Sequence, residues 1–275
     1  MSISAKIVAH SISEAGKEIV TYELVFHRYC MSEFNTHRAL SRNASSSRAV
    51  KIQSQLSSVW NNMALPVHWG KNKAGMSAKE ELTGWRLKAA KFLWKLSGKT
   101  ACVFAYLMYK VGLHKQVVNR VSEPFSYIKV LTTATEWDNF FRLRAHPDAQ
   151  PEIQALAYAM LAAYKESKPK LIKKGEWHLP YITEEMLAEV GVEDAKTLSV
   201  SLIAQTSYRA ADFTMEKARK ITNMLIQGDV VHASPYESVA TPLDDPKEPS
   251  KNLVGWKQLR DFIPNNVCTN YKYEQ

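Results

Sequence analysis

The stretch "EIVTYELVFHRYCMSEFNTHRALSRNASSSR", residues 18–48, changes character halfway along its length. Its first part, residues 18–29, alternates apolar and polar side chains and is rich in Val, Ile and Tyr, which is typical of a β-strand. The preceding segment "AKIVAHSIS", residues 5–13, shows the same alternation, and the polar turn "EAGK" separates the two. The two segments are therefore predicted to pair as neighbouring strands.

The last twelve residues of this stretch, "HRALSRNASSSR" (37–48), contain one His, three Arg, four Ser and one Asn, with Leu40 as their only large apolar residue. One Arg guanidinium group can donate two parallel hydrogen bonds to two oxygens of a phosphate. Ser hydroxyls and backbone N–H groups in a turn complete such an anion site. A solvated, Ser-rich loop has the same composition, so the residues alone leave both interpretations open.

Composition narrows the class of protein. Lys and Arg number 36 and Asp and Glu 27, which gives a formal charge of +9 and favours an anionic partner such as a nucleic acid, a nucleotide, a folate-like polyacid or an acidic surface. Three widely spaced Cys argue against a disulfide framework and a Cys-rich zinc site, and no His pair is spaced with an acid as metal ligands are, so no metal is predicted. The N-terminus lacks the pattern of a signal peptide, and the longest apolar run, residues 101–112, is too short to span a bilayer. We expect a soluble, cytoplasmic protein.

Helical spacing and strand-like alternation organise the rest of the chain. The pattern predicts one further strand, residues 126–135, and a series of helices at residues 48–64, 77–111 (with a break at Gly98), 115–125, 135–145, 150–167, 183–191 and 214–229. "TPLDDPKEPSK", residues 241–251, is predicted to be a linker, followed by a tail with a short helix around Trp256. The expected fold class is α+β, with a mixed or antiparallel sheet and several helices. We expect a single domain over residues 1–240 and a linker and C-terminal tail over residues 241–275.

Thr36-His37-Arg38 are followed by seven residues and Ser46, and two further blocks follow, at Arg120 and at residues 139–154. These three blocks, in this order, resemble the flavin-dependent thymidylate synthases. In their signature, Arg-His-Arg is followed by seven residues and a Ser; here Thr36-His37-Arg38 precede seven residues and Ser46. "NFFRLRAHPDAQPEIQ", residues 139–154, is similar to the family's Asn-x-x-x-x-Arg-x-x-x-x-Ala-Gln-x-Glu-Ile block. Further matches are Ser41, Asn43, Arg48 and the upstream Arg120. The order and approximate spacing of these matches make the resemblance specific.

Another block of this family lies out of order. "IAQTSYRAADFTMEKARKITNMLIQGDVVHASPYES", residues 203–238, resembles the segment that normally precedes the signature, and His232 and Ser234 occupy two of its positions. The resemblance therefore predicts a permuted order of elements. Residues 203–238 should then pack beside the strand at 18–29.

The resemblance implies an activity and a set of ligands. Such enzymes bind FAD between the subunits of a homotetramer, use NADPH as reductant, and transfer one carbon from methylenetetrahydrofolate to C5 of dUMP. Arg144 is the expected catalytic residue, beside the pyrimidine. The substrate-binding residues implied are Glu33, Ser45, Ser46, Ser47, Arg48, Arg120 and Arg144. The cofactor-binding residues implied are Thr36, His37, Arg38, Ala39, Asn43, Asn139, His232 and Ser234.

Departures from the family pattern keep other activities open. Thr36 stands where the family has Arg, and Ala44 where it has an acid. A sister reaction, such as hydroxymethylation or methylation of another pyrimidine nucleotide (dCMP, for example), is the nearest alternative. A basic nucleic-acid-binding protein is the alternative of another class, although no nucleic-acid-binding motif is present and no stable nucleic-acid complex or membrane contact is expected. Two loop features, His68 and the pair Trp177-His178, fit packing better than a site; for the pair, an aromatic lid is the alternative.

Overall fold

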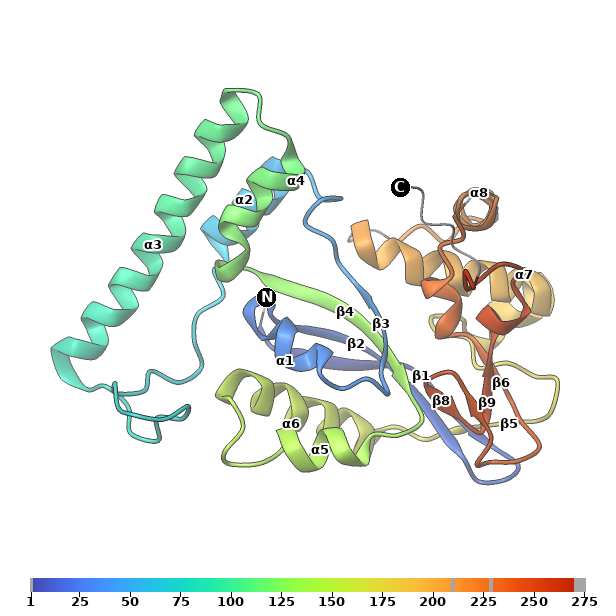
Figure 1. Cartoon of the computed structure of the whole chain (residues 1–275). Helices are drawn as coiled ribbons and strands as arrows, with labels where there is room; N and C mark the ends of the chain where they lie inside the picture. The colour runs from blue at the N-terminus through green and yellow to red at the C-terminus, as the bar shows by residue number, and fades with distance from the viewer. Residues whose placement is uncertain (1, 209–210, 228–229, 270–275) are drawn as a thin grey trace.

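A five-stranded mixed sheet lies at the centre of the computed structural model, which describes residues 2–208, 211–227 and 230–269 (Figure 1). The strand order is β3-β4-β2-β1-β5, with all neighbours antiparallel except the parallel pair β1 and β5. The strands are β1 (Ser4–Ser13), β2 (Glu18–His27), β3 (Ser41–Ala44), β4 (Tyr127–Ala134) and β5 (Lys170–Ile172). The predicted pairing of the first two strands and the α+β fold class are confirmed.

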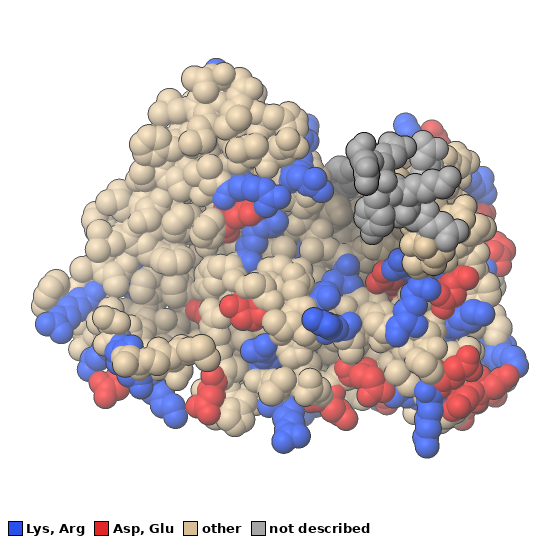
Figure 2. All heavy atoms as spheres, viewed as in Figure 1, with Lys and Arg blue, Asp and Glu red and all other residues tan. Residues whose placement is uncertain are grey.

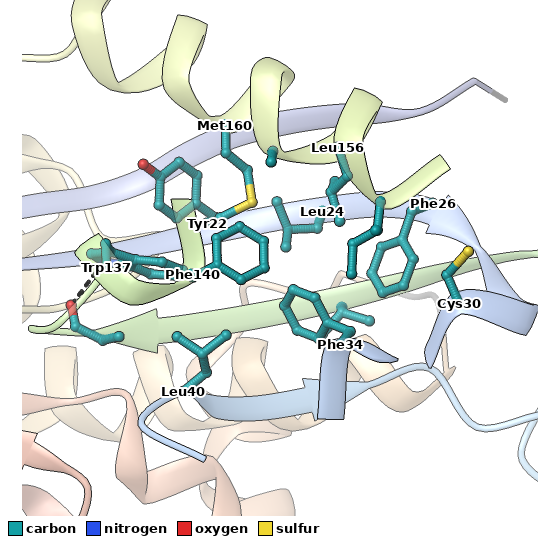
Figure 3. Close-up of a cluster of buried hydrophobic side chains, with 14 of the residues drawn as sticks. Tyr22, Leu24, Phe26, Cys30, Phe34, Leu40, Trp137, Phe140, Leu156 and Met160 are labelled. Carbon is teal, nitrogen blue, oxygen red and sulfur yellow. Dashed lines mark hydrogen bonds between the residues drawn. The ribbon is translucent and has the colours of Figure 1, made fainter. Parts of the chain in front are cut away.

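One face of the sheet carries the main apolar core. Alternate side chains of β2, from Val20 to Phe26, face three helices, α1 (Met31–Asn35), α5 (Asp138–Arg144) and α6 (Pro151–Glu166). Figure 3 shows Leu24 and Phe26 of β2 close to Leu156 of α6, with Phe34 on the other side of the cluster. The period of two in the strand and the amphipathic spacing of residues 150–167 bury their apolar side chains against each other.

The opposite face is covered by C-terminal helices. Leu131 of β4 packs against α7 (Glu184–Gln205) and against η4 (Ser234–Glu237), a 3-10 helix that follows α8 (Met215–Ile226). The described residues at 206–208 contact β3 and β4, and η4 contacts β3. Thr206 of the same segment lines a small cavity with Glu23 of β2. The expected helix end at residues 228–229 lies outside the described residues.

A group of helices projects from the β3–β4 side of the sheet (Figure 1). It contains α2 (Ile52–Asn61), α3 (Gly84–Lys110), α4 (Lys115–Val118) and η2 (Asn119–Phe125). The break expected at Gly98 is wrong, because α3 continues through it. A Cβ atom at Gly98 would lie 3.1 Å from the Phe125 ring and 2.4 Å from the end of the Met63 side chain, so this Gly permits close packing within a continuous helix.

The C-terminal segment packs against the sheet. It forms β6 (Ala240–Pro242), β7 (Pro249–Ser250), β8 (Leu253–Val254), β9 (Trp256–Gln258) and η5 (Leu259–Phe262). The helix expected around Trp256 is therefore wrong. Trp256 is fully buried in a cluster with Ile19 of β2, and its indole N–H donates to the Lys17 carbonyl at 3.1 Å. The remaining 3-10 helices, η1 (Arg28–Cys30) and η3 (Thr206–Tyr208), are short connections.

Candidate functional site

A cavity of about 610 Å³ lies beside β3, between the start of α4 and the α7–α8 region. The stretch at residues 37–48 supplies Asn43, Ser46 and Arg48, and the segment at 203–238 supplies His232 and Ser234. The end of α7 and the α8 side chains Ile221, Met224 and Leu225 complete the wall. Among the described residues that line it, none is acidic, and the volume is in the usual range for a small-molecule site. The cavity therefore suits an anionic ligand with an apolar portion.

Backbone hydrogen bonds hold the serine-rich part of this wall. Ser45 donates its N–H to the Lys129 carbonyl at 2.8 Å, and its hydroxyl accepts from the Lys129 N–H at 3.2 Å. Ser46 donates its N–H to the Ser207 carbonyl at 3.1 Å. The amide of Asn119 donates to the Ser47 carbonyl at 2.7 Å. Because Ser45 and Ser47 are buried, Ser46 and Arg48 are the members of this run that line the cavity.

The two separate segments meet directly. The Asn43 side-chain amide donates to the Ser234 carbonyl at 3.2 Å, although 191 positions separate the two residues. β3 and η4 are also neighbours in the fold. Five of the residues implied as ligands by the resemblance therefore come together in one chain.

A second group of implied residues lies apart from this cavity. The Arg144 Nε donates to His37 Nε2 at 2.8 Å, and its terminal NH2 nitrogen donates to the Thr36 hydroxyl at 3.2 Å. His37 is buried, with its ring edge-to-face against Phe140 at 4.9 Å between ring centroids. Burial, and then the charges of Arg144 and Arg42, lower the pKa of His37 to about 4. His37 is thus neutral at physiological pH and accepts a hydrogen bond from Arg144, and neither residue lines the main cavity.

The other implied residues have separate environments. Arg38 lines a neighbouring cavity of about 460 Å³, which shares Ser234 with the main one. Arg120 is exposed, with an ion pair to Glu123 at 3.6 Å, and Asn139 is exposed on α5. The remaining two have local contacts: the Glu33 carboxylate accepts from Ser32 at 2.7 Å, and the Ala39 carbonyl accepts from Asn252 at 3.5 Å.

Two residues of the cavity wall, His114 and Gln116, are not predicted from the sequence. His114 and Gln116 line it from the start of α4, and the His114 Nδ1 accepts from the Gln116 N–H at 3.4 Å. Nothing in the sequence marks them, because they follow a region, residues 50–112, that matches the family poorly. For α8 the sequence predicts a helix, but it assigns none of Ile221, Met224 and Leu225 to a site.

The loop histidines are structural. His178 is fully buried, with its ring nitrogens at 2.8 Å from the hydroxyls of Ser11 and Thr21. Burial lowers its pKa to about 3. His68 Nε2 lies 2.7 Å from the Ala78 carbonyl. A packing role therefore fits His178 better than a role in a lid over the site.

Other kinds of site have little support among the described residues. Burial raises the pKa of the Cys30 thiol and of the Cys102 thiol, so neither is an activated nucleophile. Within the described ranges, no group of three or more His, Cys, Asp or Glu side chains is placed to hold a metal ion. The same part of the chain contains no helix that is both long and apolar enough to cross a membrane.

The cavity fits a flavin cofactor by its donors. Asn43, Ser234 and His232 offer amide, hydroxyl and imidazole groups, and the apolar α8 side chains offer a surface for a flat ring. Arg48 adds positive charge to the main cavity, and Arg38 adds positive charge to the neighbouring cavity that shares Ser234 with it. These groups match the mixed apolar and anionic character of a flavin dinucleotide.

Comparison with known proteins supports the resemblance over a limited region. The family model described as "Thymidylate synthase complementing protein" matches residues 124–170, which include β4, α5 and α6. No curated protein sequence matches the chain.

Solved structures show a weaker similarity. The crystal structure of a UMP/dUMP methylase PolB from Streptomyces cacaoi bound with 5-Br UMP has a TM-score of 0.49 and 15% identity, and the match covers 60% of this chain and 90% of that chain. The structure of the same methylase bound with 5-Br dUMP has a TM-score of 0.49 and 16% identity, covering 60% and 91%. At these TM-scores the structural matches carry no argument for this chain. Over residues 124–170, however, the chain matches the thymidylate synthase complementing protein family, and the resemblance to the flavin-dependent thymidylate synthases is confirmed for this segment.

Proposed function

We propose that this protein is a flavin-dependent methyltransferase that transfers one carbon from methylenetetrahydrofolate to C5 of a pyrimidine deoxynucleotide, with dUMP as the substrate and dTMP as the product. The single observation that carries the proposal is the main cavity, where Asn43, Ser46 and Arg48 meet His232 and Ser234. The family match at residues 124–170 is independent of that cavity and agrees with it. The permuted order of elements belongs to the same proposal, because the fold brings the out-of-order segment to the signature.

The residues of the cavity divide by charge. Arg48 and Ser46 are suited to the nucleotide phosphate, since a guanidinium and a hydroxyl both donate to phosphate oxygens. Asn43, His232 and Ser234 are suited to FAD, which when bound supplies the redox chemistry and carries the one-carbon unit. NADPH is the proposed reductant. A sister reaction on another pyrimidine nucleotide stays the alternative, because Ala44 stands where the family has an acidic residue, and the loss of that acid could change which nucleotide is accepted.

Sites shared between subunits explain why Arg144 and Arg120 lie outside the cavity of their own chain. In a homotetramer, a neighbouring subunit can bring these two cations to the nucleotide. We propose this arrangement for Arg144, which would then stabilise the negative charge that develops on the pyrimidine ring as C5 reacts. Its contact with neutral His37 holds the guanidinium in place.

An exposed apolar face on α3 supports assembly from several copies. Its members, which we call the α3 stripe, follow helical spacing of seven and four residues: Trp85, Phe92, Leu96, Val103 and Leu107. Each is between 48% and 74% exposed in the single chain. Figure 2 shows that the surface over this projection carries few charged side chains on the face in view. From Trp85 to Leu107 the stripe extends for about 33 Å along the helix, and an exposed apolar face of this kind is typical of an interface.

Flavin and nucleotide binding test the proposal. The purified protein should bind FAD, with a change in flavin absorbance, and addition of dUMP should change the flavin spectrum again if the two ligands are adjacent. A protein that binds no flavin in micromolar FAD, but binds nucleic acid, would instead support the alternative class.

A further inference from the structure

A second cationic cavity lies next to the main one and is built partly by the C-terminal segment. Its volume is about 460 Å³, and it meets the main cavity at Ser234. Its charged lining residues are four cations, Arg38, Arg42, Lys251 and Arg260, and one carboxylate, Glu237, so their formal charges sum to four minus one, or +3. Two of these cations have carboxylate partners, since Glu237 pairs with Arg260 and Asp261, which is outside the lining, pairs with Lys251.

The cations differ in how they are held. The Arg42 guanidinium donates to the backbone carbonyls of Phe34 at 3.3 Å and His37 at 3.2 Å, so its position is set by the loop. Arg260 pairs with Glu237 and donates to the Asn266 carbonyl at 3.0 Å. The Arg260 Nε is buried and has no hydrogen-bond partner among the described residues. Two of the guanidinium groups that line the cavity are therefore held in place by contacts within the chain.

The other two cations are closer to solvent. Lys251 adopts a left-handed backbone conformation, with φ of 55°, and pairs with Asp261. Arg38 is exposed. The Asn252 amide, which also lines the cavity, provides a neutral polar group. Arg38 and Lys251 therefore offer their charges from the solvent side of the cavity lining.

We propose that this cavity binds the diphosphate group of a dinucleotide, and that Lys251 and Arg260 of the C-terminal segment supply cations to it. The inference rests on the proposed function for the identity of the dinucleotide, since FAD and NADPH both contain a diphosphate. Several guanidinium and ammonium groups around one cavity match the two negative charges and many acceptor oxygens of such a group. Continuity through Ser234 places the diphosphate next to the proposed flavin position in the main cavity.

This assignment also gives a physical role to a departure in the signature. Thr36 stands where the family has Arg, so the chain has one cation fewer at the start of the signature. Lys251 and Arg260 come from a segment outside the region of resemblance, and they add two cations near Arg38. Positive charge lost in one segment is thus replaced from another.

The test uses the full-length protein with inorganic pyrophosphate, measured by isothermal titration calorimetry. Lys251→Gln removes the charge and keeps most of the side chain, and Lys251→Arg restores the charge. Lys247→Gln is the matched control, because Lys247 lies in the same segment but does not line the cavity. We expect pyrophosphate affinity to fall about tenfold in Lys251→Gln, as for loss of one charge-assisted contact, and to stay unchanged in Lys251→Arg and Lys247→Gln.

Flavin ligands then identify the source of the diphosphate. If FAD is the ligand, Lys251→Gln should weaken FAD binding about tenfold and leave riboflavin binding unchanged, because riboflavin lacks the diphosphate. Loss of NADPH affinity with FAD affinity intact would assign the cavity to the nicotinamide dinucleotide. Equal pyrophosphate affinity in Lys251→Gln and the unaltered protein, or no pyrophosphate binding at all, would overturn the inference. A protein that binds pyrophosphate through Lys251 but binds no flavin would refute the proposed function and leave the diphosphate site standing.

Discussion

Replacing Arg144 by Ala separates a structural role from a catalytic one. In the structure this residue donates to His37 at 2.8 Å and to Thr36 at 3.2 Å. A hydrogen bond from a charged donor contributes about 1.5–3 kcal/mol when buried, and partial exposure of Arg144 reduces this to about 1 kcal/mol. We therefore expect a small loss in the free energy of unfolding. If Arg144 also reaches the nucleotide of a neighbouring subunit, turnover should fall by about 10²-fold or more.

The pKa of His37 reports whether the contact exists in solution. Burial and the charge of Arg144 together lower this pKa to about 4. Removing Arg144 should raise the pKa, but it should stay below the ordinary value of 6.5, because burial is the larger cause. A histidine NMR titration measures the change directly.

Two further variants complete this experiment. Arg142→Ala, on the same helix and exposed, is the matched control and should change neither turnover nor the His37 pKa. Arg144→Lys should restore turnover poorly, since an ammonium lacks the planar guanidinium fork. Turnover of Arg144→Ala within a few-fold of the unaltered protein, with only the stability lowered, would refute the catalytic role.

Five other changes have distinct expected outcomes. Arg48→Ala should weaken nucleotide binding about tenfold by calorimetry, whereas Ser45→Ala should mainly lower the melting temperature, since its hydroxyl accepts from a backbone N–H; the reverse pattern would contradict the assigned wall. His178 has a folded-state pKa of about 3, so the unfolded chain takes up its proton first and stability falls as the pH drops below about 6.5. At pH 5 the free energy of unfolding, measured in urea, should be about 2 kcal/mol lower than at pH 7.5, and in His178→Gln the decrease over this pH range should be correspondingly smaller. The same pH dependence in His178→Gln and the unaltered protein would contradict the burial of a neutral His178. Leu96→Glu in the α3 stripe should lower the molar mass by light scattering; the exposed control Lys95→Glu should not, and an unchanged mass for Leu96→Glu would show that the stripe is not the interface. Trp256→Ala should cost about 3–5 kcal/mol of stability, and a near-neutral effect would show that the C-terminal segment contributes little to the fold.

The sheet and the helices with strong periodicity could be predicted from the sequence. The alternation in residues 5–13 and 18–29 specifies which side chains face the core, and the helix at residues 150–167 has one apolar face. The meeting of Asn43 with Ser234 was implied only by the resemblance, because local patterns contain no information about contacts 191 positions apart.

The C-terminal strands and the continuity of α3 could not be predicted in the same way. β7 and β8 have two residues each, in a segment rich in Pro and charge, so no alternation is long enough to detect. Gly98 favours a helix break by its own propensity, but packing against Phe125 decides the outcome. The pairing of Arg144 with His37 likewise depends on the tertiary position of α5.

Identification of the nucleotide product by mass spectrometry tests the central claim most directly. The protein is incubated with FAD, NADPH, methylenetetrahydrofolate and dUMP, with dCMP in a parallel reaction, and Arg48→Ala is included as the variant impaired in nucleotide binding. We expect the protein to convert dUMP to a nucleotide one methylene unit heavier, and the Arg48→Ala variant to form this product much more slowly at limiting dUMP. A product from dCMP or a hydroxymethylated nucleotide would contradict the assigned reaction. No nucleotide product in any reaction, from a protein that holds flavin, would contradict the proposed activity as a whole.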